Sequence, residues 1–128
     1  MPPSWPFLKW YGLELEGCLA LGFDLDFARE QISNLQDYGF ANVQHKATKI
    51  PIETWPKHKT TKAIGHNMRL SYLEGLEAMS IGPLCRGLGW NKEAMDVYLV
   101  DVRKSIMTPS VHAYHPFHIY YGQKPEEQ

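Results

Sequence analysis

Two groups of side chains in this 128-residue chain have the types and spacing to do chemistry. The first lies in residues 65–90, where the pattern predicts a helix followed by a glycine-rich exit loop. One face of that helix carries both apolar and acidic residues, namely Leu70, Glu74, Glu77 and Ile81. Carboxylates at the border of an apolar stripe can line a pocket, orient a donor or act as a base. The alternative is that both are solvated charges, because carboxylates are rarely buried unpaired.

The second group lies in residues 111–121, which are rich in β-branched and aromatic residues and predict a strand. Alternation in a strand places four titratable or amphipathic rings on one face, those of His112, Tyr114, His118 and Tyr120. The other face carries Val111, Ala113, His115, Phe117, Ile119 and Tyr121, and we expect it to be core. The rings can donate hydrogen bonds to a substrate, or they can pack structurally with their polar tips satisfied.

Metal chemistry is disfavoured by the same alternation. His115 points away from His112 and His118, so the three histidines do not form a metal triad. Cys18 and Cys85 stand in no Cys-x-x-Cys or Cys/His ligand spacing, which argues against a structural zinc. We therefore expect no metal and no disulfide.

Length and charge exclude several classes of protein. A chain of 128 residues predicts one domain, 1–128, large enough to bury a core. The formal charge of -1 and the lack of a clustered basic excess argue against nucleic-acid binding. No apolar run is long enough to span a membrane, and no leader follows Met1. We expect a cytoplasmic protein with reduced thiols.

Turn residues and hydrophobic periodicity divide the chain into helices and two strands. Three prolines delay the first helix until about residue 8, and residues 1–7 and 123–128 are expected to be loosely ordered. Helices are predicted over 8–21, 24–39, a short segment after 60, 65–81 and 91–107, and strands over 41–52 and 111–121. The helix over 91–107 has an N-cap, Asn91, and an apolar stripe of Met95, Leu99, Val102 and Ile106.

Several segments together resemble the C-terminal part of the S-adenosylmethionine-dependent methyltransferases of fungal secondary metabolism. They are DYGFANVQ, KIPIETWPKHKTTKAIG, YLEGLEAMS, LGWNKEAMDVYLVDVRK and HAYHPFHIYYGQKPE. The family pattern has a GF before a strand, a PIG-WP turn, LEG in a helix, LGW before the last long helix, and HAY with YG-KP at the end. The resemblance covers about residues 10–125.

The resemblance implies a fold and a missing part. The family binds its cofactor through an acidic, glycine-rich loop after the first strand of a Rossmann-like half, and nothing in this chain resembles that loop. In such enzymes the last two strands are antiparallel neighbours, so 41–52 and 111–121 are expected to pair. The expected fold is α+β, an antiparallel two-stranded pair packed by about five helices, without the cofactor-binding half.

Three functions are compatible with such a chain. The first is a cofactor-independent small-molecule cyclase, pericyclase of the Diels-Alderase kind, or isomerase of fungal natural-product biosynthesis, which reuses the substrate pocket; this rests on analogy between folds. The second is a non-catalytic partner or regulatory subunit of a methyltransferase. The third is an inactive fragment, which the intact helix caps and stripes argue against. The polar and aromatic side chains that are expected to face the interior favour the cyclase. No cofactor is expected.

The cyclase hypothesis assigns roles to ten residues and a cleft between the helix over 65–81 and the His112–Tyr120 face. The catalytic candidates are His112, His118, Tyr114 and Glu74. The substrate-binding candidates are Tyr72, Glu77, Met79, Trp55, Trp90 and Tyr120. The expected substrate is a hydrophobic small molecule, a terpenoid or a polyketide. An uncovered sheet edge and apolar face would favour a symmetric homodimer.

Overall fold

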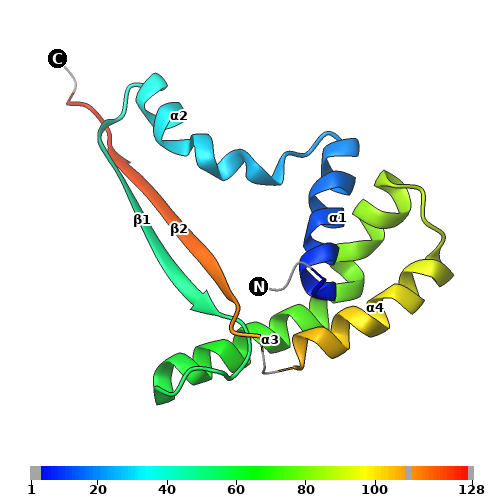
Figure 1. Cartoon of the computed structure of the whole chain (residues 1–128). Coiled ribbons are helices and arrows are strands. Elements are labelled where there is room, and N and C mark those ends of the chain that lie inside the picture. Colours follow the sequence, from blue (N-terminus) through cyan, green and yellow to red (C-terminus); the bar gives the residue numbers. More distant parts are fainter. Residues whose placement is uncertain (1–3, 109–110, 127–128) are drawn as a thin grey trace. The chain divides into compact units, whose positions relative to one another are not determined.

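The computed structural model describes residues 4–108 and 111–126, and its fold is α+β with two antiparallel strands (Figure 1). The elements in chain order are α1 (Pro6–Ala20), a 3-10 helix η1 (Leu25–Glu30), α2 (Gln31–Asp37), β1 (Ala41–Pro51), α3 (Lys59–Ser80), a π-helix η2 (Ile81–Gly87), α4 (Lys92–Ile106) and β2 (Tyr114–Gln123). The predicted fold class is therefore confirmed.

The chain forms two compact units. The helical unit comprises Met1–Leu25 and Ile50–His115, and the hairpin unit comprises Asp26–Lys49 and Pro116–Gln128. Each of the two strands passes from one unit into the other. The expectation that residues 1–128 act as a single domain stays a prediction.

The helical unit begins earlier than the prolines suggested. α1 starts at Pro6, because proline has a backbone φ suited to the first helical turn and lacks an N–H that would be unpaired there. Trp5 and Phe7 are only 7% and 5% exposed, and the Trp5 indole donates to the Ser105 carbonyl at 3.3 Å. The expectation of a loosely ordered start is wrong for these residues, since two aromatic rings anchor the segment in the core.

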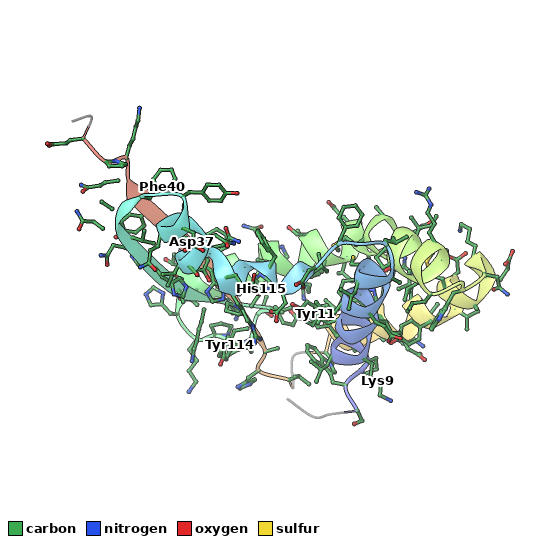
Figure 2. The ribbon with its side chains drawn as sticks, turned by 90° about the horizontal axis from the view of Figure 1, so that it is seen from above. Lys9, Tyr11, Asp37, Phe40, Tyr114 and His115 are labelled. Atoms are coloured by element: carbon green, nitrogen blue, oxygen red, sulfur yellow. The ribbon has the colours of Figure 1, made fainter. Side chains whose placement is uncertain are left out.

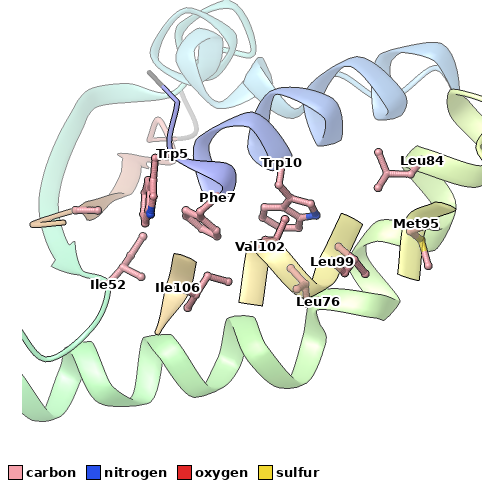
Figure 3. Close-up of a cluster of buried hydrophobic side chains, with 11 residues drawn as sticks. Trp5, Phe7, Trp10, Ile52, Leu76, Leu84, Met95, Leu99, Val102 and Ile106 are labelled. Atoms are coloured by element: carbon pink, nitrogen blue, oxygen red, sulfur yellow. The ribbon is translucent and has the colours of Figure 1, made fainter. Parts of the chain in front are cut away.

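The core of the helical unit lies between α1, α3, η2 and α4 (Figure 3). Its fully buried members include Leu76, Leu84 and the predicted stripe of α4, Met95, Leu99, Val102 and Ile106. The predicted N-cap is confirmed, since Asn91 Oδ1 accepts a hydrogen bond from the Ala94 N–H at 2.7 Å. Sequence periodicity therefore identified the centre of the core correctly.

α1 and η2 pack backbone against backbone. A β-carbon at Gly17 would collide with the carbonyl of Pro83, and one at Gly87 would collide with the backbone of Gly17. The close approach of α1 and η2 is possible only because neither Gly17 nor Gly87 has a side chain.

α3 is one continuous helix from Lys59, longer than predicted, and the π-helix η2 follows it directly.

The hairpin unit is exposed. In β2, Phe117, Ile119 and Tyr121 are 50%, 43% and 56% exposed, so the expectation of a core face is wrong for these three. It is confirmed for Ala113, which precedes β2 and is 1% exposed. Strand alternation predicts that such a row shares one face, but it does not predict whether anything covers that face. Gly39, with φ of 86°, ends α2 at the predicted place.

Candidate functional site

Tyr72 is the predicted site residue that is best embedded in the helical unit. It lies half-buried on α3, where its ring makes edge contacts with Phe7 and Trp10 at centroid distances of 5.0 and 6.2 Å. Its hydroxyl lies 3.4 Å from Nδ1 of His115. Burial, with a smaller contribution from Tyr11, raises the pKa of Tyr72, so the phenol is a neutral hydrogen-bond donor or acceptor.

Trp55 and His112 are brought together within the helical unit. Their rings stack with centroids 4.8 Å apart and planes 10° from parallel. The Trp55 indole donates to the carbonyl of Ala113 at 2.9 Å, and the N–H of Ile52 donates to the same oxygen at 3.0 Å. The two hydrogen bonds hold residue 113 and thereby fix the position of the neighbouring His112.

Glu74, Glu77 and Met79 lie on the exposed side of α3. Glu77 Oε1 is 3.4 Å from Nζ of Lys92, and both side chains are 54% exposed. Gly65 packs against the backbone of Glu53 at the base of the hairpin, and Glu77 lies twelve residues further along α3, which is about 18 Å of helix. The two acidic residues therefore occupy a different part of α3 from the contacts at the hairpin base.

The remaining predicted residues are distributed over both units. Trp90 makes an edge contact with Tyr98 at 5.3 Å in the helical unit. Tyr114 is 44% exposed, and Figure 2 shows it beside His115 at the beginning of β2. His118 and Tyr120 belong to the hairpin unit, where they share one face as predicted. The catalytic and binding roles given to the ten residues stay predictions.

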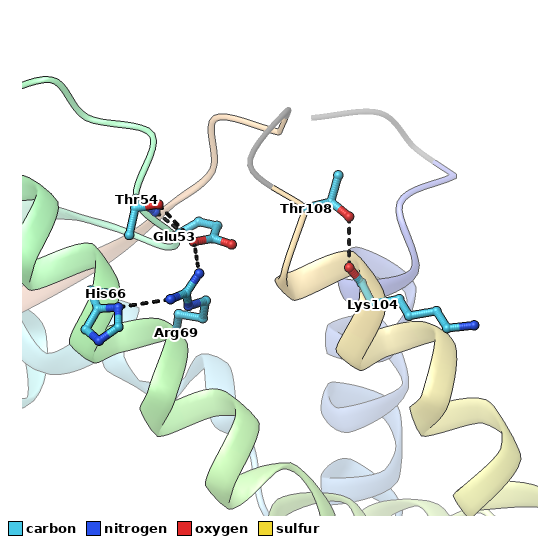
Figure 4. A network of polar contacts seen from close by, with 6 residues as sticks. All are labelled: Glu53, Thr54, His66, Arg69, Lys104 and Thr108. Atoms are coloured by element: carbon cyan, nitrogen blue, oxygen red, sulfur yellow. Dashed lines mark hydrogen bonds and ion pairs between the residues drawn. The ribbon is translucent and has the colours of Figure 1, made fainter.

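Sequence reasoning missed an ion pair centred on Glu53. This residue is 2% exposed and has a left-handed backbone with φ of 80°. Its Oε1 accepts hydrogen bonds from the Thr54 N–H at 2.9 Å and from Arg69 at 2.6 Å, and Arg69 also lies 2.9 Å from Nδ1 of His66 (Figure 4). Glu53 Oε2 is buried without a hydrogen-bond partner. The one sequence signal was a glutamate at the position of the glycine in the PIG-WP turn.

A second missed group is Glu14 of α1, which is 6% exposed. Burial raises its pKa to about 7, against a smaller opposing effect of the neighbouring Ser80 hydroxyl. The Ser80 hydroxyl accepts from the Trp10 indole at 2.8 Å and donates to the Leu76 carbonyl at 2.6 Å. Glu14 Oε1 is buried without a partner. Glu14 is therefore a core carboxyl that is partly protonated near neutral pH.

Within residues 4–108 and 111–126, no group of three or more His, Cys, Asp or Glu side chains is placed to hold a metal ion. Over the same ranges, no helix has both the length and the apolar character needed to cross a membrane.

Comparison with curated proteins confirms the resemblance indicated by the motifs: the homologues of this chain are methyltransferases and methyltransferase-like regulators of fungal secondary metabolism. The chain is 30% identical to the secondary metabolism regulator LAE1 of Cochliobolus heterostrophus over 99% of its own length and 42% of the relative. It is 32% identical to the methyltransferase pytC of Aspergillus terreus over 97% of its length and 38% of that protein.

A third relative, the protein-methionine methyltransferase laeA of Emericella nidulans, is 29% identical over 77% of this chain and 26% of its own length. The chain thus spans less than half the length of each of these three relatives. No family model and no solved structure matches it.

Proposed function

We propose that this chain completes a methyltransferase-like protein of fungal secondary metabolism by adding its hairpin to a cofactor-binding sheet. In this role it is a non-catalytic partner of the cofactor-binding part. The observation that carries the proposal is the exposed apolar row on β2, formed by Phe117, Ile119 and Tyr121.

The physical argument starts from the marginal stability of two-stranded sheets. An isolated pair of strands is barely stable in water, and its two outer edges present unpaired backbone donors and acceptors. Addition to another sheet pairs those groups, and helices packed on the enlarged sheet would cover the apolar row. Pro116 blocks one position for a backbone donor, so the remainder of β2 offers the better edge. The greater length of the relatives supports a larger sheet as the partner.

The test is to mix the chain with Aspergillus terreus pytC from which the segment matched by this chain has been deleted. We expect co-elution in size-exclusion chromatography and recovery of S-adenosylmethionine binding in isothermal titration. Phe117→Lys with Ile119→Lys should abolish the complex, whereas Val97→Lys, at a 72% exposed position of α4, should not. A complex that ignores the hairpin substitutions would contradict the proposal.

Without such a partner, we expect the chain to bind no S-adenosylmethionine, because it has no glycine-rich loop after a strand. Saturable binding by the chain alone at millimolar cofactor would contradict this expectation. We also expect a symmetric homodimer that covers the apolar row. A monomeric mass in light scattering at micromolar concentration would contradict the dimer.

A cofactor-independent cyclase or pericyclase acting on a hydrophobic terpenoid or polyketide is the second candidate function. The observation favouring it is two pairs of rings from residues on either side of Ala113, in which Trp55 stacks on His112 and Tyr72 lies beside His115. Cyclisation needs a folded near-attack conformer and one or two donors to a carbonyl that gains charge. Imidazole and phenol groups can supply such donors.

The cyclase proposal is tested by single substitutions of the four catalytic candidates, His112, Tyr114, His118 and Glu74. Removal of a donor to a developing oxyanion should slow turnover about tenfold or more, which is roughly 1 to 4 kcal/mol of barrier. Circular dichroism controls for folding, and turnover of polyene or polyketide precursors is the readout. Wild-type rates in all four variants would refute the site assignment.

A further inference from the structure

The hairpin unit contains a pair of histidines from opposite strands. His45 of β1 and His118 of β2 are 73 residues apart in sequence, yet His45 Nε2 lies 2.8 Å from His118 Nδ1. The imidazole planes are 24° from parallel. Tyr120 stacks on His45 with a centroid distance of 4.4 Å and an interplanar angle of 5°. Both histidines are exposed, so a solute can reach the ring nitrogens.

We propose that His45 Nε2 and His118 Nδ1 form a two-ligand site for a divalent transition-metal ion, Cu²⁺ or Ni²⁺, with water in the remaining positions. Neutral imidazole is the commonest protein ligand for such ions, and both ring nitrogens already face one another. Metal binding replaces the hydrogen bond between the rings by two metal–nitrogen bonds. The ring that donates this hydrogen bond moves its proton to its other nitrogen, so both imidazoles stay neutral ligands and no net proton is released.

The separation of the two nitrogens selects among metal geometries. Metal–imidazole bonds are about 2.0–2.1 Å long, so cis ligands at 90° lie about 2.9 Å apart and tetrahedral ligands lie about 3.3 Å apart. The observed distance of 2.8 Å is close to the separation of cis ligands on square-planar Cu²⁺ or octahedral Ni²⁺, so the direction of the two lone pairs has to change on binding but the spacing of the nitrogens does not. Tetrahedral Zn²⁺ would require the rings to separate by roughly half an ångström.

The surrounding contacts hold the pair in place. Nearer the open end of the strands, Asn42 Nδ2 donates to Gln123 Oε1 at 2.7 Å, which ties β1 to β2. The stacked Tyr120 ring restricts rotation of His45. The sequence pattern considered only the histidines of residues 112–118, and the ligand partner of His118 comes from the other strand. Two ligands held in advance reduce the entropy lost on binding.

The experiment is a titration of the full chain with CuSO4, in which binding is measured by isothermal titration calorimetry and the ligands are identified by electron paramagnetic resonance. We expect one Cu²⁺ per chain with nitrogen hyperfine coupling. His45→Ala and His118→Ala should each weaken binding at least tenfold, whereas the matched variant His58→Ala, at an exposed position before α3, should bind as the parent does. His118→Phe keeps a stacked ring without a ligand, and it should lose binding with the strands intact.

A second measurement separates a built site from surface binding. NiCl2 should raise the thermal unfolding midpoint of the parent, because the metal links two strands, and it should not raise that of His118→Phe. Ni²⁺ should also bind more tightly than Zn²⁺. The proposal is overturned if His58→Ala weakens binding as much as His118→Ala does, or if the double variant His45→Ala with His118→Phe binds Cu²⁺ like the parent.

Discussion

The helical unit and the hairpin unit differ in how they are stabilised. The helical unit buries a continuous cluster of aromatic and aliphatic side chains, several of them completely. In the described part of the hairpin unit, by contrast, no residue is buried. Removal of apolar surface from water is the dominant favourable term in folding, so the intrinsic stability of this chain resides in the helical unit. The hairpin unit leaves the apolar side chains of β2 and the imidazoles of His45 and His118 exposed.

The largest expected effect tests this contrast with two substitutions of similar size. Leu99→Ala in α4 removes a fully buried side chain and should lower the free energy of unfolding by about 2 to 5 kcal/mol. Ile119→Ala, at a 43% exposed position of β2, should cost less than about 1 kcal/mol. Urea denaturation measures both. The proposed homodimer would cover the face of β2, so the comparison is made at a chain concentration at which light scattering shows a monomer. Comparable losses in the monomer would contradict the exposure of this face.

The second prediction compares an ion pair from each unit. Arg69→Ala leaves the buried Glu53 carboxylate without its countercharge and should destabilise the chain by about 2 to 3 kcal/mol. Arg29→Ala breaks the ion pair with Asp26. The side chain of Arg29 is 81% exposed and that of Asp26 is 57% exposed, so the free energy of unfolding should change by less than about 0.5 kcal/mol. Thermal unfolding at matched ionic strength distinguishes them. Equal effects would contradict the burial of Glu53.

The third prediction concerns pH. The pKa of Glu14 is raised from 4.5 to about 7, so the folded chain retains a proton that the unfolded chain loses. The stabilisation that the Glu14 proton gives to the folded chain is fully present below pH 4.5. It declines as the pH rises towards 7 and is absent at higher pH. Glu14→Gln removes this decline.

Unfolding curves for the parent and for Glu14→Gln at pH 4 and pH 8 test this linkage. The variant should be more stable than the parent at pH 8, by about 1 to 3 kcal/mol, and the difference should shrink at pH 4. A difference that does not depend on pH would show that Glu14 titrates normally in the folded chain.

The smallest expected effect is that of a helix cap. Asn91→Ala removes the acceptor for the Ala94 N–H and should destabilise α4 by about 1 kcal/mol. Asn91→Asp keeps an acceptor for the Ala94 N–H and should therefore retain the stability of the parent. Thermal unfolding followed by circular dichroism measures the stability of both variants. The matched substitution Asn42→Ala in β1 should leave the thermal unfolding midpoint of the helical unit unchanged. A shift in that midpoint would couple the two units.

Sequence patterns predicted local features well. Periodicity identified the stripe of α4 and its cap, and the predicted strand 41–52 agrees with β1 over Ala41–Pro51. These features depend on residues close together in the chain. The start of α1 was missed because proline is unfavourable inside a helix but favourable in its first turn.

Contacts between distant residues could not be predicted in the same way. The Glu53–Arg69 pair and the His45–His118 pair join residues of different elements, and charged and imidazole side chains are in general more often exposed than buried. Burial of the Phe117 face was predicted wrongly, because alternation defines the two faces of a strand but not their neighbours. Of the predicted site residues, Trp55 contacts His112 and Tyr72 lies beside His115, and their roles in a site stay predictions.

The connection between the two strands constrains the order of events during synthesis. β1 ends at Pro51 and β2 begins at Tyr114, so residues 52–113, which contain α3, η2 and α4, emerge from the ribosome between them. A pairing this remote in sequence forms slowly unless the intervening chain has already contracted, because loop closure costs entropy before any contact is gained. The helices must therefore assemble first, and β1 remains without a partner during translation. That interval is when a nascent chain is most prone to pair its exposed strand with a neighbour's.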